Sequence, residues 1–247
     1  MLGACASESD HAVHLTEDGS CTVSSQRYGE TYHSTFGALT EAQHVFLDAT
    51  GVSERLIAGL PTRVLEIGFG LGLNTLLTAD LARKHGTPLV YHSFEHDLVT
   101  TPLIRSLGYA TLISDTAVHD ALLDAVTALH ALSAVPAQAS LSHHCLLSDD
   151  IQLSLHYGDA STANLQTLGE TNFHAIYLDA FSPDTNAECW DPVFIASLAG
   201  VLAEDGCLST YSAKGSVRRA MLAAGLVVKK LPGPPGKREM LLGTRVS

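Results

Sequence analysis

A glycine-rich turn at residues 66–74 restricts the possible folds of this chain more than any other feature. The turn reads Glu-Ile-Gly-Phe-Gly-Leu-Gly-Leu-Asn. It follows an apolar run at 63–69, which predicts a buried strand, and opens a stretch at 73–84 with helical apolar spacing. Another apolar run at 89–94 predicts a second strand, so the segments form one strand–helix–strand unit. Glycines there let a ligand approach the backbone, and the helix N-terminus favours anionic or polar ligand groups.

The alternation of strands and helices continues to the end of the chain. Further strands are expected at 152–157, 173–178, 206–211, 226–230 and 238–244, and further helices at 115–133, 192–203 and 216–224. This order predicts an α/β protein with a mostly parallel sheet of seven strands and helices on both faces. Residues 1–30 are polar and lack a clear period, which predicts an irregular N-terminal arm before a single domain at 31–247.

Acidic residues follow three of these strands. Glu95 ends the second strand, where a carboxylate can accept hydrogen bonds from the ribose hydroxyls of a nucleoside. Gly158-Asp159-Ala160 follows the third strand, and Asp179 follows the fourth. A solvated strand end or a plain turn would explain any one of these acids. Because ligands of such sheets bind at the carboxyl ends of the strands, their common position predicts a nucleoside-containing ligand.

The glycine pattern distinguishes between two kinds of nucleotide site. The dinucleotide fingerprint G-x-G-x-x-G fails, because Leu73 stands where its last glycine should be. The pattern E-x-G-x-G-x-G resembles instead the first motif of class I S-adenosylmethionine (SAM) methyltransferases. That resemblance implies their Rossmann-like fold, SAM as the cofactor, and an acid of the third strand near the adenine amino group. The implied cofactor contacts in the turn are Glu66, Gly68, Gly70, Gly72 and Asn74.

A second resemblance is more specific. Residues 179–190, D-A-F-S-P-D-T-N-A-E-C-W, resemble the D-A-F-S-P-x-x-N-P-x-x-W segment of the MnmC/MnmD family, which makes 5-methylaminomethyluridine in tRNA. Residues 32–46 and the segment G-K-R-E-M at 236–240 resemble other parts of that family, so the matches extend over 28–244. Ala187 replaces the usual proline, which alters the rigidity of a turn more than its chemistry. The stretch at 110–150 looks like an insert and has no assigned role.

This resemblance implies a reaction and a partner. The reaction is methyl transfer from SAM to the 5-aminomethyl group of the wobble uridine, which gives 5-methylaminomethyl(-2-thio)uridine, and the partner is the anticodon region of tRNA. Asp179 would orient the amine and take its proton directly or through water. Phe181 would stack on the base, with ordinary core packing as the alternative. The expected substrate contacts are Tyr32, Ser34, Phe181, Pro183, Lys237 and Arg238.

The distribution of charge agrees with an anionic partner. The chain has a formal net charge of −12, yet residues 210–247 contain eight basic residues and one acid. Such asymmetry suggests phosphate binding by the basic segment, although a solvated face would look the same. Lys237 and Arg238 are the preferred phosphate contacts, because a turn brings them near the catalytic strand ends. Alternatively, Arg238 pairs with Glu239 or another acid and fixes the last strand.

Two other classes of protein are compatible with these residues. A spermidine-synthase-like aminopropyltransferase shares the fold and would suit an acidic protein, and a non-catalytic SAM- or RNA-binding module is also possible. Five scattered cysteines without metal-ligand spacing favour a cytoplasmic protein with no metal site. The sequence contains no run of 18 apolar residues, so no membrane span is expected. The chain leaves no room for the flavin domain fused to some family members, so a stand-alone methyltransferase domain is expected.

Overall fold

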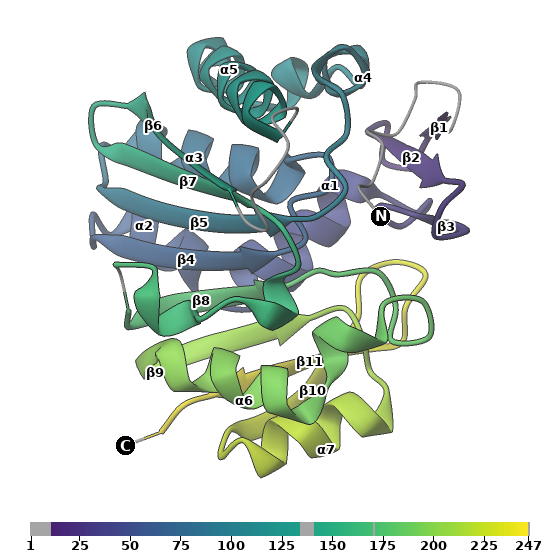
Figure 1. Ribbon diagram of the computed structural model, residues 1–247, viewed down its shortest axis with the longest axis vertical. Coiled ribbons are helices and arrows are strands. Elements are labelled where there is room, and N and C mark those ends of the chain that lie inside the picture. Colours follow the sequence, from purple (N-terminus) through teal and green to yellow (C-terminus); the bar gives the residue numbers. More distant parts are fainter. Residues whose placement is uncertain (1–10, 134–140, 170, 247) are drawn as a thin grey trace.

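An eight-stranded, mostly parallel sheet forms the centre of the molecule (Figure 1). The structure is a computed structural model that describes residues 11–133, 141–169 and 171–246. The strand order is β10-β11-β9-β8-β4-β5-β7-β6, and neighbours from β9 to β7 are parallel. The strands are β4 (Thr62–Ile67), β5 (Leu89–Glu95), β6 (Leu141–Ser148), β7 (Ile151–Tyr157), β8 (Phe173–Leu178), β9 (Leu202–Thr210), β10 (Val227–Pro232) and β11 (Glu239–Thr244).

All seven expected strands are present, but the expected number was wrong by one. The additional strand is β6, which pairs antiparallel with β7 at the edge of the sheet. Its sequence, Leu-Ser-His-His-Cys-Leu-Leu-Ser, mixes small polar and aromatic polar residues, so it lacks a clear apolar pattern. The stretch at 110–150 therefore contributes this strand and the long helix α5 (Thr116–Ser133), which packs against it.

Helices cover both faces of the sheet, as expected. On one face, the π-helix η2 (Ala42–Asp48) and helices α3 and α5 enclose a core around Tyr91 and Tyr177. On the other face, α6 and α7 enclose a core around Leu178 and Leu208; these two helices lie in front of the sheet in Figure 1. The α-helices are α1 (Ala38–Glu41), α2 (Val52–Ile57), α3 (Leu73–His85), α4 (Thr101–Ser106), α5, α6 (Pro192–Val201) and α7 (Gly215–Ala223).

A small antiparallel sheet precedes the main one. It consists of β1 (His11–Leu15), β2 (Cys21–Ser25) and β3 (Glu30–Thr31). The expectation of an irregular arm was wrong for these residues, and residues 1–10 lie outside the described chain. The small sheet is anchored because Val23 is fully buried and because the hydroxyl of Tyr109 donates to the carbonyl of Cys21 at 2.8 Å. Its strands are too short and too polar to show a clear alternation in the sequence.

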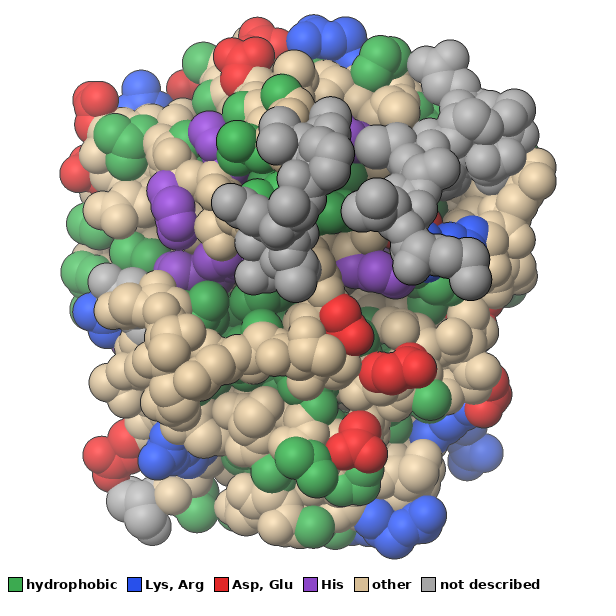
Figure 2. All heavy atoms as spheres, viewed as in Figure 1, with side chains coloured by type: hydrophobic (Ala, Val, Ile, Leu, Met, Phe, Trp, Pro, Cys, Tyr) green, Lys and Arg blue, Asp and Glu red, His purple; other side chains and the backbone are tan. Residues whose placement is uncertain are grey.

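A group of histidines lies on the face of β5, β7 and β6. Nδ1 of His92 and Nε2 of His156 are 3.0 Å apart, and the hydroxyl of Ser142 lies 2.7 Å from the other ring nitrogen of His156. Burial lowers the pKa of His92 to about 4 and that of His156 to about 3. Figure 2 shows histidine side chains gathered over this part of the sheet. The buried pair is therefore neutral at pH 7.

Candidate functional site

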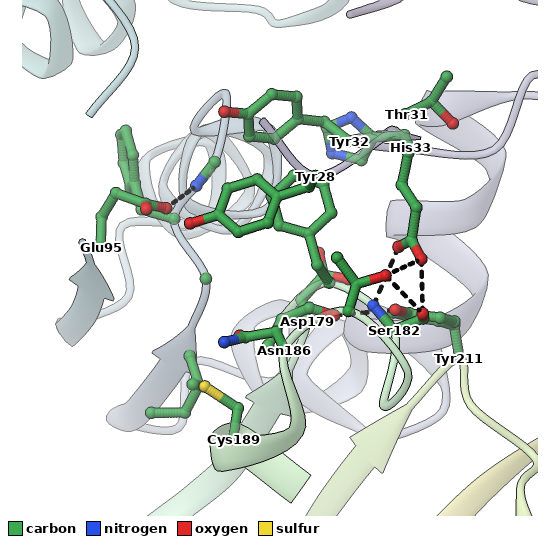
Figure 3. Close-up of a pocket in the computed structure, with 18 of the residues that line it drawn as sticks. Tyr28, Thr31, Tyr32, His33, Glu95, Asp179, Ser182, Asn186, Cys189 and Tyr211 are labelled. Atoms are coloured by element: carbon green, nitrogen blue, oxygen red, sulfur yellow. Dashed lines mark hydrogen bonds between the residues drawn. The ribbon is translucent and has the colours of Figure 1, made fainter. Parts of the chain in front are cut away.

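The carboxyl ends of β4, β5, β7 and β8 open into a cavity of about 720 Å³ (Figure 3). Parallel strands end at one edge of the sheet, so residues distant in sequence meet there. The turn between β2 and β3 and the turn between β10 and β11 complete the wall. The expected site residues that line the cavity are Tyr32, Ser34, Gly68, Gly70, Glu95, Gly158, Asp159, Ala160, Asp179, Phe181 and Lys237.

Five of the expected residues lie outside this lining: Glu66, Gly72, Asn74, Pro183 and Arg238. Glu66 is fully buried beneath the turn, where its Oε2 accepts from the hydroxyls of Thr75 at 2.9 Å and Ser93 at 2.6 Å. Burial raises the pKa of Glu66 to about 7. The amide of Asn74 contacts Asp179 from behind the cavity wall. Glu66 and Asn74 therefore support the site from within the protein.

The glycine turn requires glycine at the cavity surface. Gly68 has φ +97°, and a Cβ there would lie 2.6 Å from the carbonyl oxygen of Asp179. Gly70 has φ +54°, and a Cβ there would lie 3.0 Å from Cδ1 of Tyr32. Both conformations are ones that L side chains rarely adopt. The turn therefore leaves bare backbone facing the cavity, which fits close approach by a bound nucleoside.

Glu95 is held in one orientation by backbone amides. Its Oε2 accepts from the amide of Gly70 at 2.8 Å, and its Oε1 accepts from the amides of His96 at 2.8 Å and Asp97 at 2.7 Å. Burial raises the pKa of Glu95, while these three donors oppose that rise. A carboxylate has about four acceptor positions, so a bound diol can still donate to it. This carboxylate, beside the glycine turn, fits the ribose of SAM.

The region after β7 contributes a second acid to the same side of the cavity. One carboxylate oxygen of Asp159 accepts from the amide of Ser161 at 2.9 Å and from its hydroxyl at 2.7 Å. These bonds hold the start of the turn that follows Gly158. Both of these bonds use Oδ1 of Asp159, and its side chain lines the cavity. The second carboxylate oxygen of Asp159 can therefore accept a hydrogen bond from a ligand whose ribose donates to Glu95.

Asp179 lies at the end of β8, across the glycine turn from Glu95. Its Oδ2 accepts from Nδ2 of Asn74 at 2.8 Å. Burial raises the pKa of Asp179 well above its ordinary value, and the nearby carboxylates of Glu41 and Glu66 add to the rise. A carboxylate with a raised pKa is a stronger base than an exposed one. Asp179 is therefore suited to accept a proton from a ligand in the cavity.

Lys237 reaches the cavity but is already engaged in an ion pair. Its ammonium contacts Oε1 of Glu41 at 2.5 Å and lies 3.9 Å from the ring centroid of Tyr211. Oε2 of Glu41 accepts from the backbone amide of Ser34 at 2.7 Å. The expected phosphate contact is therefore part of the cavity wall. This ion pair joins two segments that are 196 residues apart.

The other half of the expected basic pair lies elsewhere. Arg238 is exposed and is not among the residues that line the cavity. Glu239 forms an ion pair with Lys230 at 2.7 Å across the β10–β11 hairpin, and this contact, together with the charge of Arg238, lowers the pKa of Glu239. Arg238 thus remains available to a partner that approaches the rim from solvent.

Aromatic side chains form a cluster beside Glu95, where the hydroxyl of Tyr28 lies 3.3 Å from Nδ1 of His96. The ring of Phe181 stacks on Tyr28 with centroids 4.2 Å apart and an interplanar angle of 23°, and it meets Tyr32 in an edge-to-face arrangement with centroids 5.0 Å apart. One face of Phe181 is therefore covered before any base arrives. Phe36, which sequence reasoning missed, lines the rim and is 45% exposed. Its ring packs on Gly236, because a Cβ built at Gly236 would lie 2.1 Å from Cδ2 of Phe36.

Sequence reasoning also missed Tyr28, Glu30, Glu41 and Tyr211 as cavity residues. Glu41 belongs to a segment that resembles the MnmC/MnmD family, which was the one signal available for it. Tyr28 and Glu30 lie in the stretch that was expected to be irregular. The hydroxyl of Tyr211 donates to the carbonyl of Ala180 at 2.8 Å, and no pattern in the sequence predicts this contact.

Comparisons with known proteins agree with this geometry. A family described as S-adenosyl-L-methionine-dependent methyltransferase matches residues 124–246. The bifunctional protein MnmC of Burkholderia pseudomallei (strain K96243), described as acting in tRNA 5-methylaminomethyl-2-thiouridine biosynthesis, is 35% identical over 237 residues. The MnmC protein of Burkholderia mallei (strain SAVP1) is equally similar. The matches cover 92% of this chain, which spans about a third (34%) of the length of these relatives.

A solved structure shares the fold. The crystal structure of MnmC2 from Aquifex aeolicus superposes with a TM-score of 0.69 at 22% identity, covering 97% of this chain and 72% of that one. The class I, Rossmann-like methyltransferase fold expected from the glycine motif is therefore confirmed. In the part of the chain that the structure describes, no helix has both the length and the apolar character needed to cross a membrane.

Proposed function

We propose that this chain is an S-adenosyl-L-methionine-dependent methyltransferase that methylates the 5-aminomethyl group of the wobble uridine in tRNA, because a family of that description matches residues 124–246 and the MnmC relatives are 35% identical. The product would be 5-methylaminomethyl(-2-thio)uridine. The observation that carries the proposal is the position of Asp179, a buried carboxyl group with a raised pKa beside the glycine turn and opposite Glu95. The names of the MnmC relatives support the choice of substrate, and we propose a cytoplasmic location because the substrate would be tRNA.

The chain offers a separate position to each part of the cofactor, which supplies a methyl group on a sulfonium when it is bound. The bare backbone at Gly68 and Gly70 would receive its amino-acid part. The carboxylate of Glu95 would accept from the ribose hydroxyls, and Asp159 would accept from the adenine amino group. Glu66, Gly72 and Asn74 would act from behind the cavity wall, because they do not line it.

The charge of the cavity favours cationic ligands. Six carboxylates line it against two basic side chains, Arg27 and Lys237. A cleft lined mainly by one sign of charge concentrates ligands of the opposite sign. Both a sulfonium and a protonated aminomethyl group would be attracted. The same charge suits a polyamine, so an aminopropyltransferase is the second candidate. The carboxylates belong to Glu30, Glu41, Glu95, Asp159, Asp179 and Glu188.

Asp179 would prepare the amine for attack. An alkyl amine resembles the amine of lysine, whose ordinary pKa is about 10.4, so it is mostly protonated at pH 7 and has no free lone pair. Asp179 would take that proton, directly or through a water molecule. Its raised pKa makes this transfer less unfavourable than transfer to an exposed carboxylate. Asn74 would keep the carboxylate oriented toward the cavity.

The RNA contacts proposed here differ from those expected from the sequence. Phe36 would stack on an unpaired base at the rim, because its side chain is 45% exposed, whereas Phe181 packs against both Tyr28 and Tyr32. Arg238, which is exposed, would contact phosphate, whereas Lys237 would stay paired with Glu41. We expect Phe36→Ala to raise KM for tRNA about ten-fold, as loss of one stacked base predicts. Phe36→Tyr is the matched control and should keep the wild-type KM.

Labelled methyl transfer separates the two candidate functions. In the first reaction, purified protein would be given methyl-labelled SAM and tRNA that carries 5-aminomethyluridine. In the second reaction, it would be given decarboxylated SAM and putrescine. Mass analysis of the digested nucleosides should show 5-methylaminomethyluridine in the first reaction. Formation of spermidine, without methylated nucleoside, would replace the proposal by the aminopropyltransferase. Bulk tRNA that already carries the methylated nucleoside serves as the negative control.

A further inference from the structure

Glu30, at the start of β3, reaches across the cavity to the loop that follows Asp179. Its Oε2 accepts from the backbone amide of Ser182 at 3.0 Å, and its Oε1 accepts from the hydroxyls of Ser182 at 2.5 Å and Thr185 at 2.6 Å. The dashed lines beside Ser182 in Figure 3 mark these bonds. The two segments are 152 residues apart in sequence. One carboxylate thus fastens the small N-terminal sheet to the catalytic loop.

The loop after Asp179 is fixed at successive backbone groups by different elements. The amide of Asp179 donates to the carbonyl of Ile67 at 2.9 Å. Tyr211, just after β9, donates to the carbonyl of Ala180, and the indole of Trp190 donates to the carbonyl of Phe181 at 2.8 Å. The next backbone group along the loop is the amide of Ser182, which Glu30 holds. Without Glu30, the last of these restraints would be absent.

The bonds made by Glu30 are charge-assisted. Partial burial opposes ionisation, but the hydrogen bonds from Ser182 and Thr185 prevail and lower the pKa of Glu30. The carboxylate is therefore ionised at neutral pH. Hydrogen bonds to an ionised acceptor are roughly twice as strong as neutral ones. Three such bonds at one carboxylate can hold a loop that contains no helix or strand.

We propose that Glu30 is a positioning residue that fixes the loop from 179 to 185, and with it the carboxylate of Asp179, for proton transfer. The inference rests on the proposed methyl transfer. Proton transfer and in-line displacement both require close alignment, and a displacement of about 1 Å at such a site lowers the rate about a hundred-fold. Because Glu30 contacts the loop and leaves the glycine turn untouched, its loss should affect turnover more than SAM binding.

Two substitutions separate geometry from charge. Glu30→Ala removes all three acceptor contacts and should lower kcat about ten- to a hundred-fold, with the Kd for SAM changed less than about three-fold. Glu30→Gln can keep the geometry, because its carbonyl accepts from the amide of Ser182 while its NH2 donates to the hydroxyls of Ser182 and Thr185. The glutamine variant should keep kcat within about three-fold of wild type. Glu17→Ala, which removes an exposed carboxylate from the turn between β1 and β2 of the small sheet, is the control.

Hydrogen exchange at the amide of Ser182 provides a readout independent of activity. Exchange should accelerate about ten-fold or more in Glu30→Ala, as expected when a charge-assisted bond is lost, and stay near wild type in Glu30→Gln. Unchanged kcat in Glu30→Ala, or equal damage by both substitutions, would overturn the proposal, since the second result would mean that the charge itself acts on the substrate. If wild-type protein does not methylate tRNA, the proposed function fails, and unchanged exchange in Glu30→Ala would separately overturn the restraint by Glu30.

Discussion

The ion pair between Glu41 and Lys237 predicts that Lys237 contributes to stability and leaves phosphate binding to other residues. Lys237→Met keeps the alkyl stem but leaves the carboxylate of Glu41, whose side chain is 6% exposed, without its cation. Removing one partner of a buried ion pair lowers the free energy of unfolding by about 3–5 kcal/mol. We expect about 3 kcal/mol, at the low end, because the side chain of Lys237 is 32% exposed and Ser34 still donates to Glu41.

The reciprocal substitution should be milder. Glu41→Gln leaves an ammonium that can turn toward water and still contact the ring of Tyr211, so we expect a loss of about 1 kcal/mol. The double variant Lys237→Met with Glu41→Gln should be more stable than Lys237→Met alone, because no uncompensated charge stays buried. A coupling energy of about 2 kcal/mol between the two sites is expected from this cycle.

Two measurements on the same preparations test this reasoning. Urea unfolding at pH 7 gives the free energy of unfolding of each variant, provided that the m-value is unchanged. Binding of tRNA at several salt concentrations gives the number of phosphate contacts. Lys237→Met should keep the wild-type salt slope, and Arg238→Ala should lower it by somewhat under one. If Lys237→Met loses less than about 1 kcal/mol and also lowers the salt slope, Lys237 leaves Glu41 to hold phosphate and the reasoning is refuted.

Three further predictions concern cofactor binding, the proton-accepting role of Asp179, and stability at acidic pH. Glu95→Ala should weaken SAM binding about ten- to a hundred-fold in calorimetry, because it removes a charged acceptor worth about 1.5–3 kcal/mol; unchanged affinity would exclude the ribose contact. Asp179→Asn should lower kcat about a hundred-fold or more with little change in SAM affinity, and near-normal turnover at saturating substrate would leave Asp179 a structural role. In the folded protein, the pKa of His92 is lowered from its ordinary value of 6.5 to about 4, and that of His156 to about 3. Below pH 6.5 the unfolded chain therefore binds more protons at these two residues than the folded protein does. The free energy of unfolding should fall as pH drops from about 6.5 to about 3. His156→Gln should weaken that dependence in urea unfolding across this range, and an unchanged dependence would assign acid sensitivity to other groups.

The cofactor half of the cavity could be predicted because its residues belong to short contiguous patterns. The glycine turn and Glu95 lie within one strand–helix–strand unit, and parallel strand order alone brings Asp179 to the same edge. Strand positions in the main sheet followed from apolar runs for the same reason. β6 lacked such a run, because polar residues occupy both of its faces: His143 lies on the half-buried side with Leu141 and Cys145, and His144 lies on the exposed side.

The pairings across the cavity could not be predicted from the sequence. Periodicity shows which face of an element is buried, but it does not show which loop reaches which. Lys237 was therefore assigned to phosphate by its charge, while its partner Glu41 lies 196 residues earlier. Glu30 stood in a polar stretch with no visible period, so neither its strand nor its contact with Ser182 was foreseen. Phe181 was placed correctly in the cavity, but its stacking on Tyr28 depends on tertiary structure.

The strand order at the carboxyl-terminal edge has a consequence for biosynthesis. β11 lies between β9 and β10, although β10 leaves the ribosome first. β10 therefore has no neighbour in the main sheet until β11 is made, and the two strands must join β9 together as a hairpin. The turn of that hairpin carries Lys237 to Glu41. The cavity is thus completed only after β11 has been made, and a nascent chain that stops before β11 exposes an unpaired edge of β9 and has an open site.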